Sequence, residues 1–329
     1  MGENYGLPYT GSKSRIAHWV IDHLPRGRVL IDAFAGGCAI THRALLSQKW
    51  QTVIANDING KYPQLFLDAV RGKYRDERRW ISREDFERLK AKDAFVACCW
   101  SFGNCLMHYM YSPAIEPYKR ALHYAIVLDD FAPMQELIPE VAQAVADALD
   151  GIRNTHDRRI TAQNVIVKTL KRLTDDNYAH QIIQSNPLYK NIRHSSKDAQ
   201  SLERLQSLES LERLERLQSL QSLEAPERLE RLQITSLSYA DIDIPADAVV
   251  YCDPPYHASD KKLYDGTARF DHCAFYDWCV RVSKTNPIFI SEYSIEDDRF
   301  EIVAEKQKIT SFASVKSSIV TERIYTVKK

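Results

Sequence analysis

The chain has 329 residues, and its 44 lysines and arginines are balanced by 44 aspartates and glutamates, so the formal net charge is zero. A domain commonly holds about 100–150 residues, so we expect one full domain and a large insertion or second module. Without an overall positive field, any surface that attracts nucleic acid must come from local segregation of charge.

Cysteines and apolar runs narrow the class of protein. The seven cysteines form no C-x-x-C pair, which is typical of reduced thiols rather than of disulfides or a zinc site. We therefore predict no metal site. No stretch reaches the about 18 consecutive apolar residues of a membrane span, so we expect a soluble, cytoplasmic protein without a membrane partner.

The first predicted element is a helix that follows a glycine loop. The loop is Pro8–Lys13, and Ile16, Trp19, Val20 and Leu24 follow at helical spacing. Loop N–H groups and a lysine at a helix start favour a carboxylate or a phosphate. Taken alone, the segment is better explained as an ordinary capped surface helix.

Two predicted strands then end in acids. The run Arg28–Ile31 leads into a glycine turn, D-A-F-A-G-G at 32–37, and a helix over 38–48. Strand, glycine turn and helix form the first half of a dinucleotide-type crossover. The spacing is not G-x-G-x-x-G, which argues against NAD and favours another nucleoside. A second strand, 52–56, ends at Asp57, about 20 residues after the turn, where ribose hydroxyls are held.

The next segment changes in character. Residues 71–93 carry dense charge of both signs, which predicts a solvated helical face with Trp80, Phe86 and Leu89 turned inward. Residues 101–119 interleave aromatics and amides. This composition suits base contacts on a loop, and it equally suits an aromatic core layer.

The strongest electrostatic signal for nucleic acid lies at 153–197, where nine positive side chains face only three negative ones. Within it, 160–173 is a predicted helix with Ile160, Val165, Val167 and Leu170 inward and Asn164 and Lys168 outward. The helix either reads bases or touches only phosphates. The candidate phosphate contacts are Arg158, Arg159, Lys168, Lys171, Arg172, Lys190 and Arg193.

Residues 201–233 form a tract with leucine at nearly every third position. A period of three slips against the 3.6 residues of an α-helical turn, so the stripe would circle a helix and leave no single buried face. A 3₁₀ helix or a small solenoid would keep it aligned. We favour an exposed or loosely packed spacer without chemistry.

The C-terminal part predicts more strands, at 232–237, 248–252 and 287–291, a helix at 275–282, and a hairpin of 302–305 with 319–327. The central strand, 248–252, must stop at Asp253-Pro254-Pro255-Tyr256, because proline has no N–H for a sheet ladder. Ligands of open α/β sheets bind at the carboxyl ends of strands. The acid and free carbonyls can accept from an amino group while the tyrosine stacks on its ring. Residues 257–270 predict a flap beside this pocket.

Four blocks carry a resemblance in this order: P-Y-T-G-S-K at 8–13, D-A-F-A-G-G at 32–37, N-D-I-N at 56–59 and D-P-P-Y at 253–256. The chain resembles the D12 class of DNA adenine-N(6) methyltransferases, the Dam-like family, in its α arrangement, and especially phage and restriction-modification members. S-F-G-N at 101–104, I-E-P-Y-K at 115–119 and I-S-E-Y at 290–293 also look like phage-type segments. One departure is Cys38-Ala39, where the family often has a further glycine.

The resemblance implies a fold and its domains. The fold is α/β, a Rossmann-like methyltransferase with a mixed, mostly parallel sheet and an inserted, largely helical target-recognition domain. Residues 1–60 and 234–329 would form the catalytic domain, 61–200 the recognition insertion and 201–233 the leucine-repeat spacer.

The resemblance also implies a site. S-adenosylmethionine would lie across Tyr9, Lys13, Asp32, Phe34 and Gly36, with Asp57 on its ribose and Asp253 near its amino-acid end. A cationic methionine moiety favours carboxylates, and its own carboxylate favours Lys13 or loop N–H groups. Asp253 and the Pro254 carbonyl would accept the two N–H bonds of an adenine amino group, with Pro255 completing the rigid turn and Tyr256 stacking on the flipped base.

The implied partner is double-stranded DNA, with a cognate restriction endonuclease as a second candidate partner and a monomer favoured. Two alternatives stay open. One is an amino methyltransferase that acts on cytosine or on RNA. The other is a non-catalytic DNA- or S-adenosylmethionine-binding protein whose leucine tract is an interaction module.

Overall fold

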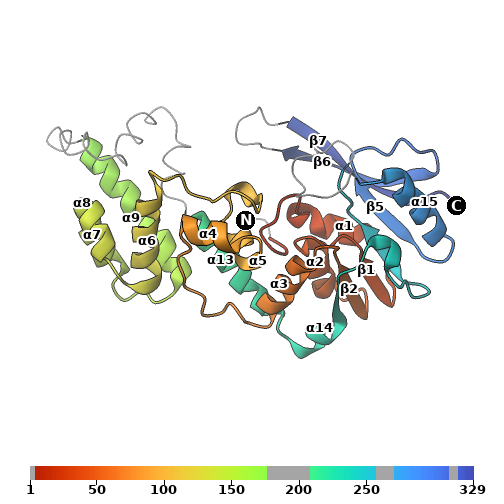
Figure 1. Cartoon of the computed structure of the whole chain (residues 1–329), viewed down its shortest axis with the longest axis horizontal. Helices are drawn as coiled ribbons and strands as arrows, with labels where there is room; N and C mark the ends of the chain where they lie inside the picture. The colour runs from red at the N-terminus through yellow and green to blue at the C-terminus, as the bar shows by residue number, and fades with distance from the viewer. Residues whose placement is uncertain (1–3, 176–207, 257–269, 311–317) are drawn as a thin grey trace. The chain divides into compact units, whose positions relative to one another are not determined.

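The computed structural model describes residues 4–175, 208–256, 270–310 and 318–329 (Figure 1). Two compact units divide the chain: unit 1 comprises Met1–Arg75 and Arg216–Lys329, and unit 2 comprises Asp76–Glu215. The predicted recognition insertion, 61–200, therefore differs from unit 2 at both ends. The predicted flap falls almost wholly on 257–269, outside the described residues.

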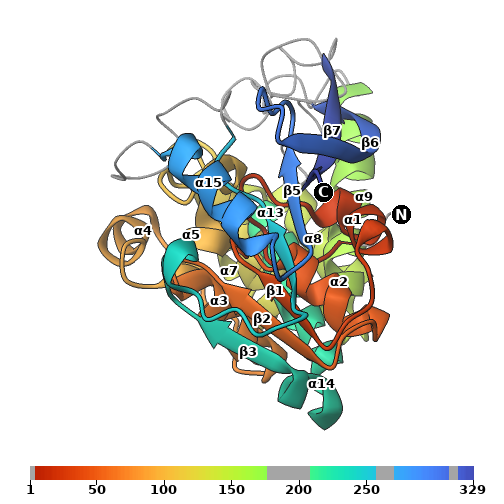
Figure 2. The same ribbon diagram turned by 90° about the vertical axis from the view of Figure 1, so that its right-hand side faces the viewer.

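Unit 1 contains a mixed sheet. Its described strands are β1 (Val29–Asp32), β2 (Thr52–Asn56), β3 (Leu232–Thr235), β4 (Val249–Cys252), β5 (Ile288–Glu292), β6 (Phe300–Thr310) and β7 (Ser318–Val327). They lie in the order β3-β2-β1-β4-β5-β7-β6, and Figure 2 labels all of them except β4. The first five in this order are parallel, and β7 pairs antiparallel with both β5 and β6. The predicted α/β class and mostly parallel sheet are confirmed.

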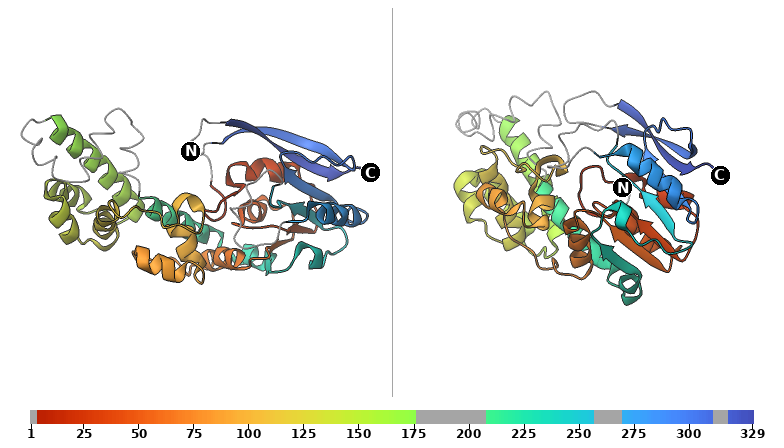
Figure 3. Two further views of the ribbon diagram at one scale, coloured as in Figure 1. Left: turned by 45° about the horizontal axis from the view of Figure 1, so that its top comes forward. Right: turned by 45° about the vertical axis from the view of Figure 1, so that its right-hand side comes forward.

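The predicted strands and the C-terminal hairpin are also confirmed, and the long hairpin β6–β7 stands out in both views of Figure 3. The first five strands are short and consist mostly of apolar or β-branched residues, and β1 and β4 are buried along their whole length. Such continuous apolar runs are typical of parallel strands covered on both faces.

The helices of unit 1 alternate with its strands. They are η1 (Ser14–Ile16), α1 (Ala17–His23), α2 (Ala39–Ser47), α3 (Lys61–Val70), η4 (Leu220–Leu223), α14 (Pro226–Arg231), η5 (Tyr239–Asp241) and α15 (His272–Val282). Helix α15 places Phe275, Trp278 and Cys279 in one cluster with Val250 of β4 and Ile290 of β5. This packing fixes β4, the strand that ends at Asp253.

Strand β1 lies between β2 and β4. On one side of β1 the sheet continues through β2 to β3, and on the other side it continues through β4 to β5, so the order of the strands reverses between β1 and β4. In open α/β sheets the crevice at such a reversal is where ligands bind. The carboxyl ends of β1, β2 and β4 therefore define the edge at which a site is expected.

The described part of unit 2 is helical. Its elements are α4 (Arg83–Leu89), α5 (Ala94–Trp100), η2 (Phe102–Asn104), α6 (Glu116–His123), η3 (Tyr124–Leu128), α7 (Ala132–Leu137), α8 (Pro139–Leu149) and α9 (Thr155–Asp175). Helix α4 has a good start, because the Ser82 side chain accepts from the Asp85 N–H and two acids occupy its first turn. Phe86 is buried, as predicted.

The leucine tract is not the exposed spacer that we expected. Its described part forms α13 (Glu209–Ser219), η4 (Leu220–Leu223) and α14, and it ends in β3. The leucines at 208, 211, 214, 217, 220 and 223 are all buried. The division between the two units falls inside α13.

The physical reason is that the helices are short. Each step of three residues turns a side chain by only about 60° from the previous one on an α-helix. Over the three leucines of α13 the stripe therefore stays within one broad face. The following turn, η4, is 3₁₀, and its three residues per turn keep Leu220 and Leu223 aligned.

Candidate active site at the carboxyl edge of the sheet

Three acids follow or end neighbouring strands at the reversal of strand order. Asp32 is the last residue of β1, and Asp57 and Asp253 come directly after β2 and β4. Backbone hydrogen bonds join these ends: Ala33 N donates to the Tyr251 carbonyl at 2.9 Å, and Ala35 N donates to the Asn56 carbonyl at 2.8 Å. The sequence placed these acids on separate strands, and the structure brings those strands together.

The Asp57 carboxylate is held by backbone on both sides. Gly36 N donates to its Oδ2 at 2.9 Å, and Asn59 N donates to its Oδ1 at 2.8 Å. Burial raises the pKa of Asp57, and the two N–H groups oppose that rise. The glycine turn and this acid therefore form one rigid unit at the end of β2.

Tyr9 packs directly on the glycine turn. A Cβ on Gly37 would lie 2.6 Å from Tyr9 Cβ, and one on Gly36, which has φ +45°, would lie 3.1 Å from Tyr9 Cε1. Only glycine admits this approach. The next residue, Cys38, adopts φ 58° at the start of α2. Cys38 stands where the family often has a further glycine, and it adopts the left-handed conformation that glycine takes most easily.

Asp32 is almost fully enclosed, with 1% of its surface exposed. Its Oδ2 accepts from Thr41 N at 3.1 Å and from Thr41 Oγ1 at 2.7 Å. Burial raises the pKa of Asp32 to about 7, although the Thr41 hydroxyl and N–H oppose the shift. This carboxyl group fastens the end of β1 to the first turn of α2.

Phe34 belongs to an aromatic cluster beside these acids. Its ring centroid lies 5.6 Å from that of Tyr239, 5.9 Å from that of Phe270 and 5.6 Å from that of Phe275. Phe34 itself is half-buried. The edge therefore combines carboxylates with an aromatic surface.

Lys13 is paired with Asp253. Its Nζ lies 2.6 Å from Asp253 Oδ1 and 2.8 Å from Oδ2, and 3.7 Å from a carboxylate oxygen of Glu322. Burial would lower the pKa of Lys13, but the carboxylates of Asp253 and Glu322 raise it above its ordinary value. The lysine is charged here, and the structure places it at D-P-P-Y.

Tyr256 completes this group. Lys13 Nζ lies 4.6 Å from the centroid of its ring, Tyr293 packs edge-on at 4.6 Å, and its hydroxyl donates to Glu322. Burial and the carboxylates of Asp253 and Glu322 raise the pKa of Tyr256 well above its ordinary value. The neutral hydroxyl therefore remains a donor.

Sequence reasoning missed Glu322. The signal was available in strand β7, where alternate residues share a face. Glu322 is in phase with buried Ile324, so its carboxylate falls on the buried side of the strand. An acid at an apolar position of a strand is a candidate for function.

In unit 2, the guanidinium groups of Arg158 and Arg159 both have internal partners. Arg158 donates to the carbonyls of Ala125 and Ile126, both at 2.7 Å, and pairs with Asp129 at 2.6 Å. Internal acceptors occupy the guanidinium group of Arg158, and its contact with DNA phosphates stays a prediction.

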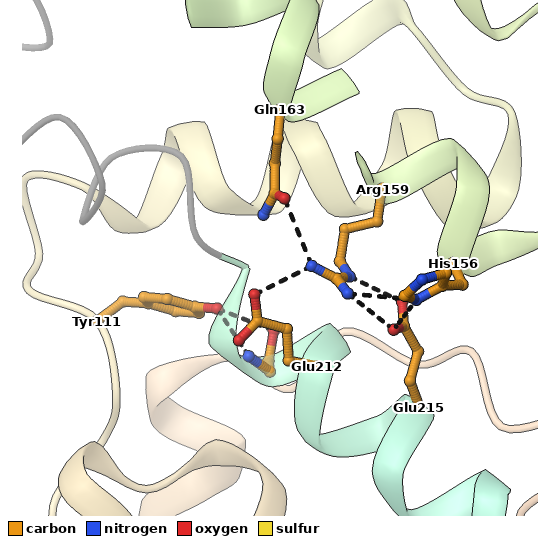
Figure 4. A network of polar contacts seen from close by, with 7 residues as sticks. Tyr111, His156, Arg159, Gln163, Glu212 and Glu215 are labelled. Atoms are coloured by element: carbon orange, nitrogen blue, oxygen red, sulfur yellow. Dashed lines mark hydrogen bonds and ion pairs between the residues drawn. The ribbon is translucent and has the colours of Figure 1, made fainter. Parts of the chain in front are cut away.

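Arg159 is held in a similar way, and Figure 4 shows it at the centre of a polar network between α9 and α13. Its guanidinium group lies 3.0 Å from Glu212 and 2.8 Å from Glu215. His156 contacts the same Glu215 at 2.8 Å. The network joins α9 to α13 within unit 2.

The inward face of α9 also differs from the predicted one. Ala162, Ile166 and Thr169 are buried, whereas Ile160 is exposed, so the predicted apolar spacing was wrong at that residue. Lys168 is exposed, as predicted. The side chains of Lys171 and Arg172, and the whole of Lys190 and Arg193, lie outside the described part.

The aromatic segment at 101–119 contains both buried and exposed rings. Tyr109, Tyr111 and Tyr118 are buried, so they form a core layer. Phe102 is instead 57% exposed and precedes Gly103 and Asn104, which have φ 57° and 59°. The tight turn presents one large apolar ring to solvent.

Two further features concern the described residues alone. No helix that the structure describes has the length and apolar character of a membrane span. Within the same ranges, no group of three or more His, Cys, Asp or Glu side chains could hold a metal ion. All seven cysteines are free, and five are buried.

The sheet and its helices are compatible with the class of methyltransferase folds. Residues 9–98 match the family model of the D12 class N6 adenine-specific DNA methyltransferase, which is an enzyme family. The resemblance read from the sequence is thereby confirmed for this segment, which carries Tyr9, Lys13, the glycine turn and Asp57. No curated protein matches the chain.

Proposed function

We propose that the protein transfers a methyl group from S-adenosylmethionine to the exocyclic amino group of an adenine flipped out of double-stranded DNA. The observation that carries the proposal is the Lys13–Asp253–Tyr256 group at the end of β4, next to the acids of β1 and β2. The matched family supports DNA adenine methylation as the reaction.

The residues at the ends of β1 and β2 fit the groups of S-adenosylmethionine. Asp57 is held by Gly36 N and Asn59 N, and each of its oxygens keeps a second lone pair that can accept from a ribose hydroxyl. The half-buried ring of Phe34 and its aromatic neighbours suit a purine. S-adenosylmethionine, when bound, supplies an electrophilic methyl group on a cationic sulfur.

On the cofactor side, Tyr9 packs closely on Gly36 and so fixes the glycine turn. Asp32 holds the start of α2 beside this turn by accepting from Thr41. Lys13 has a different assignment from the one that the family pattern suggested. Since it is paired with Asp253, we assign it to the acceptor side and leave the carboxylate of the methyl donor to loop N–H groups.

On the acceptor side, the Asp253 carboxylate and the Pro254 carbonyl accept hydrogen bonds from the two N–H groups of the adenine amino group. These bonds orient the nitrogen lone pair towards the methyl donor, so positioning supplies most of the rate enhancement. Pro255 keeps the turn rigid because its φ is fixed. Tyr256 stacks on the flipped base.

DNA contacts are proposed for unit 2. Phosphate contacts are assigned to Lys168, Lys171, Arg172, Lys190 and Arg193, while Arg158 and Arg159 are left out because internal partners hold them. The exposed ring of Phe102 is assigned to a base step or an unpaired base. A cognate restriction endonuclease remains a predicted partner, and a monomer the predicted state.

The function is tested by expressing the protein in a host that lacks DNA methylation and mapping modified bases by direct sequencing. A reproducible motif with methylated adenine is expected. Methylated cytosine would overturn the adenine assignment, and unmodified DNA from cells that contain the folded protein would overturn the proposed reaction.

A further inference from the structure

Glu322 is a fully enclosed carboxylate that touches two members of the proposed acceptor side. Its side chain has no exposed surface, while those of Lys13 and Asp253 are 6% and 18% exposed. A buried charge is costly unless it is paired and hydrogen-bonded. Here the partners are Lys13 at 3.7 Å and the hydroxyl of Tyr256.

The position of Glu322 along the sheet separates it from the cofactor side. Its neighbour Arg323 pairs with Glu292, the last residue of β5, so Glu322 lies at the carboxyl edge. Asp57 follows β2, which lies on the far side of β1 from Glu322, and Gly36 lies in the turn after β1. Glu322 therefore belongs with Asp253 and Tyr256.

The contacts of Asp253 create a requirement. Both of its oxygens lie within hydrogen-bond distance of Lys13 Nζ, and the same carboxylate must accept an N–H bond of the target amino group. Charge-assisted N–H···O bonds span about 2.7–2.9 Å, so a shift of Lys13 Nζ by about 1 Å would give it a full bond to Glu322. A second carboxylate is thus in place to take over the lysine.

We propose that Glu322 is a positioning residue for methyl transfer: it takes Lys13 from Asp253 when the target amino group arrives, and it holds the Tyr256 ring through its hydroxyl. The inference rests on the proposed function. Glu322 touches neither substrate, so its effect passes through Lys13 and Tyr256. It acts on the acceptor side alone, and binding of S-adenosylmethionine does not depend on it.

The test compares Glu322→Gln with wild type and with Glu301→Gln, the same change at an exposed position of β6. Glutamine can still accept from the Tyr256 hydroxyl, but it has no charge to draw Lys13 away. The substrates are S-adenosylmethionine and a duplex that carries the mapped adenine motif. We expect Glu322→Gln to lower kcat by about 10- to 100-fold, the cost of a misplaced reacting group. The KM for S-adenosylmethionine should stay within about twofold, because cofactor binding does not use Glu322. Glu301→Gln should match wild type.

A double-mutant cycle separates this role from a purely structural one. If Glu322 acts by taking Lys13, Glu322→Gln should cost far less kcat in a Lys13→Gln background than in wild type. Equal costs in both backgrounds, or a wild-type kcat for Glu322→Gln, would overturn the inference.

A variant that fails to fold does not end the test. Tyr256→Phe removes only the hydroxyl held by Glu322, and it should lower kcat by about tenfold. It should also change the fluorescence of 2-aminopurine placed at the target position, because the stacking ring is no longer held. A wild-type kcat and a wild-type signal for this variant would overturn the inference. Absence of transfer by the wild-type protein would instead overturn the proposed function, so the two failures are distinguishable.

Discussion

Truncation of Leu217 tests whether the leucine tract is part of the core. Leu217 belongs to α13 in unit 1, and its side chain is fully buried. Leu217→Ala removes the transfer free energy of three carbons and leaves a cavity, which together cost about 2–5 kcal/mol of unfolding free energy. Urea titration followed by circular dichroism measures this loss, and hydrogen exchange by mass spectrometry should locate it in the strands of unit 1.

The matched control is Leu229→Ala, the same change in the same repeat. Leu229 lies in α14 and is only partly buried, so its truncation should cost about 1 kcal/mol. If both variants lost less than about 1 kcal/mol, the tract would not be core, and the exposed-spacer interpretation would return.

Three further predictions concern the site and its neighbourhood. Phe102→Ala should leave the unfolding free energy unchanged, because the ring is exposed. The same change should weaken binding of a specific duplex by about 1–3 kcal/mol in a fluorescence titration. Unchanged binding would exclude Phe102 from the DNA contact. Gly37→Ala should abolish measurable binding of S-adenosylmethionine in calorimetry, because the new Cβ would lie 2.6 Å from Tyr9 Cβ. Wild-type affinity for S-adenosylmethionine would contradict the role of this packing. Burial raises the pKa of Asp32 from 3.8 to about 7, so the folded state holds this proton more tightly than the unfolded state and loses stability as the pH rises between these values. Asp32→Asn should therefore gain unfolding free energy relative to wild type from pH 4 to 7, and a difference that does not change with pH would show that the carboxyl group is ionised throughout.

The strands and the edge at which they end could be predicted because their signals are local. Apolar runs such as 52–56 and 248–252 predict buried strands, and Asp57 and Asp253 follow these runs directly. Parallel strands bring such ends to one edge whatever the rest of the chain does. This is why the positions of Asp32, Asp57 and Asp253 at strand ends could be predicted from the sequence alone.

The pairing of the acids and cations could not be predicted, because it depends on tertiary contacts. Lys13 lies 240 residues from Asp253 in the chain, yet the two form an ion pair. Arg159 counts as one more positive charge in a basic segment, until α13 brings Glu212 and Glu215 against it. Local charge density does not distinguish a guanidinium group that faces solvent from one with internal partners.

The prediction of an exposed leucine tract was wrong for a related reason. The expectation assumed one continuous α-helix, for which a period of three gives no fixed face. The break into α13, η4 and α14, with Pro226 at the start of α14, limits the drift within each piece. Helix ends, rather than periodicity, decided the burial of these leucines.

The central claim is that Asp253 holds the amino group that is methylated. The direct measurement is transfer of labelled methyl groups from S-adenosylmethionine to an unmethylated duplex with the mapped motif, by wild type and by Asp253→Ala, alongside DNA binding by both. We predict that the variant loses at least about 100-fold in kcat and still binds the duplex. A variant that transfers methyl groups at the wild-type rate, or a folded wild-type protein that never consumes S-adenosylmethionine with this DNA, would contradict the account.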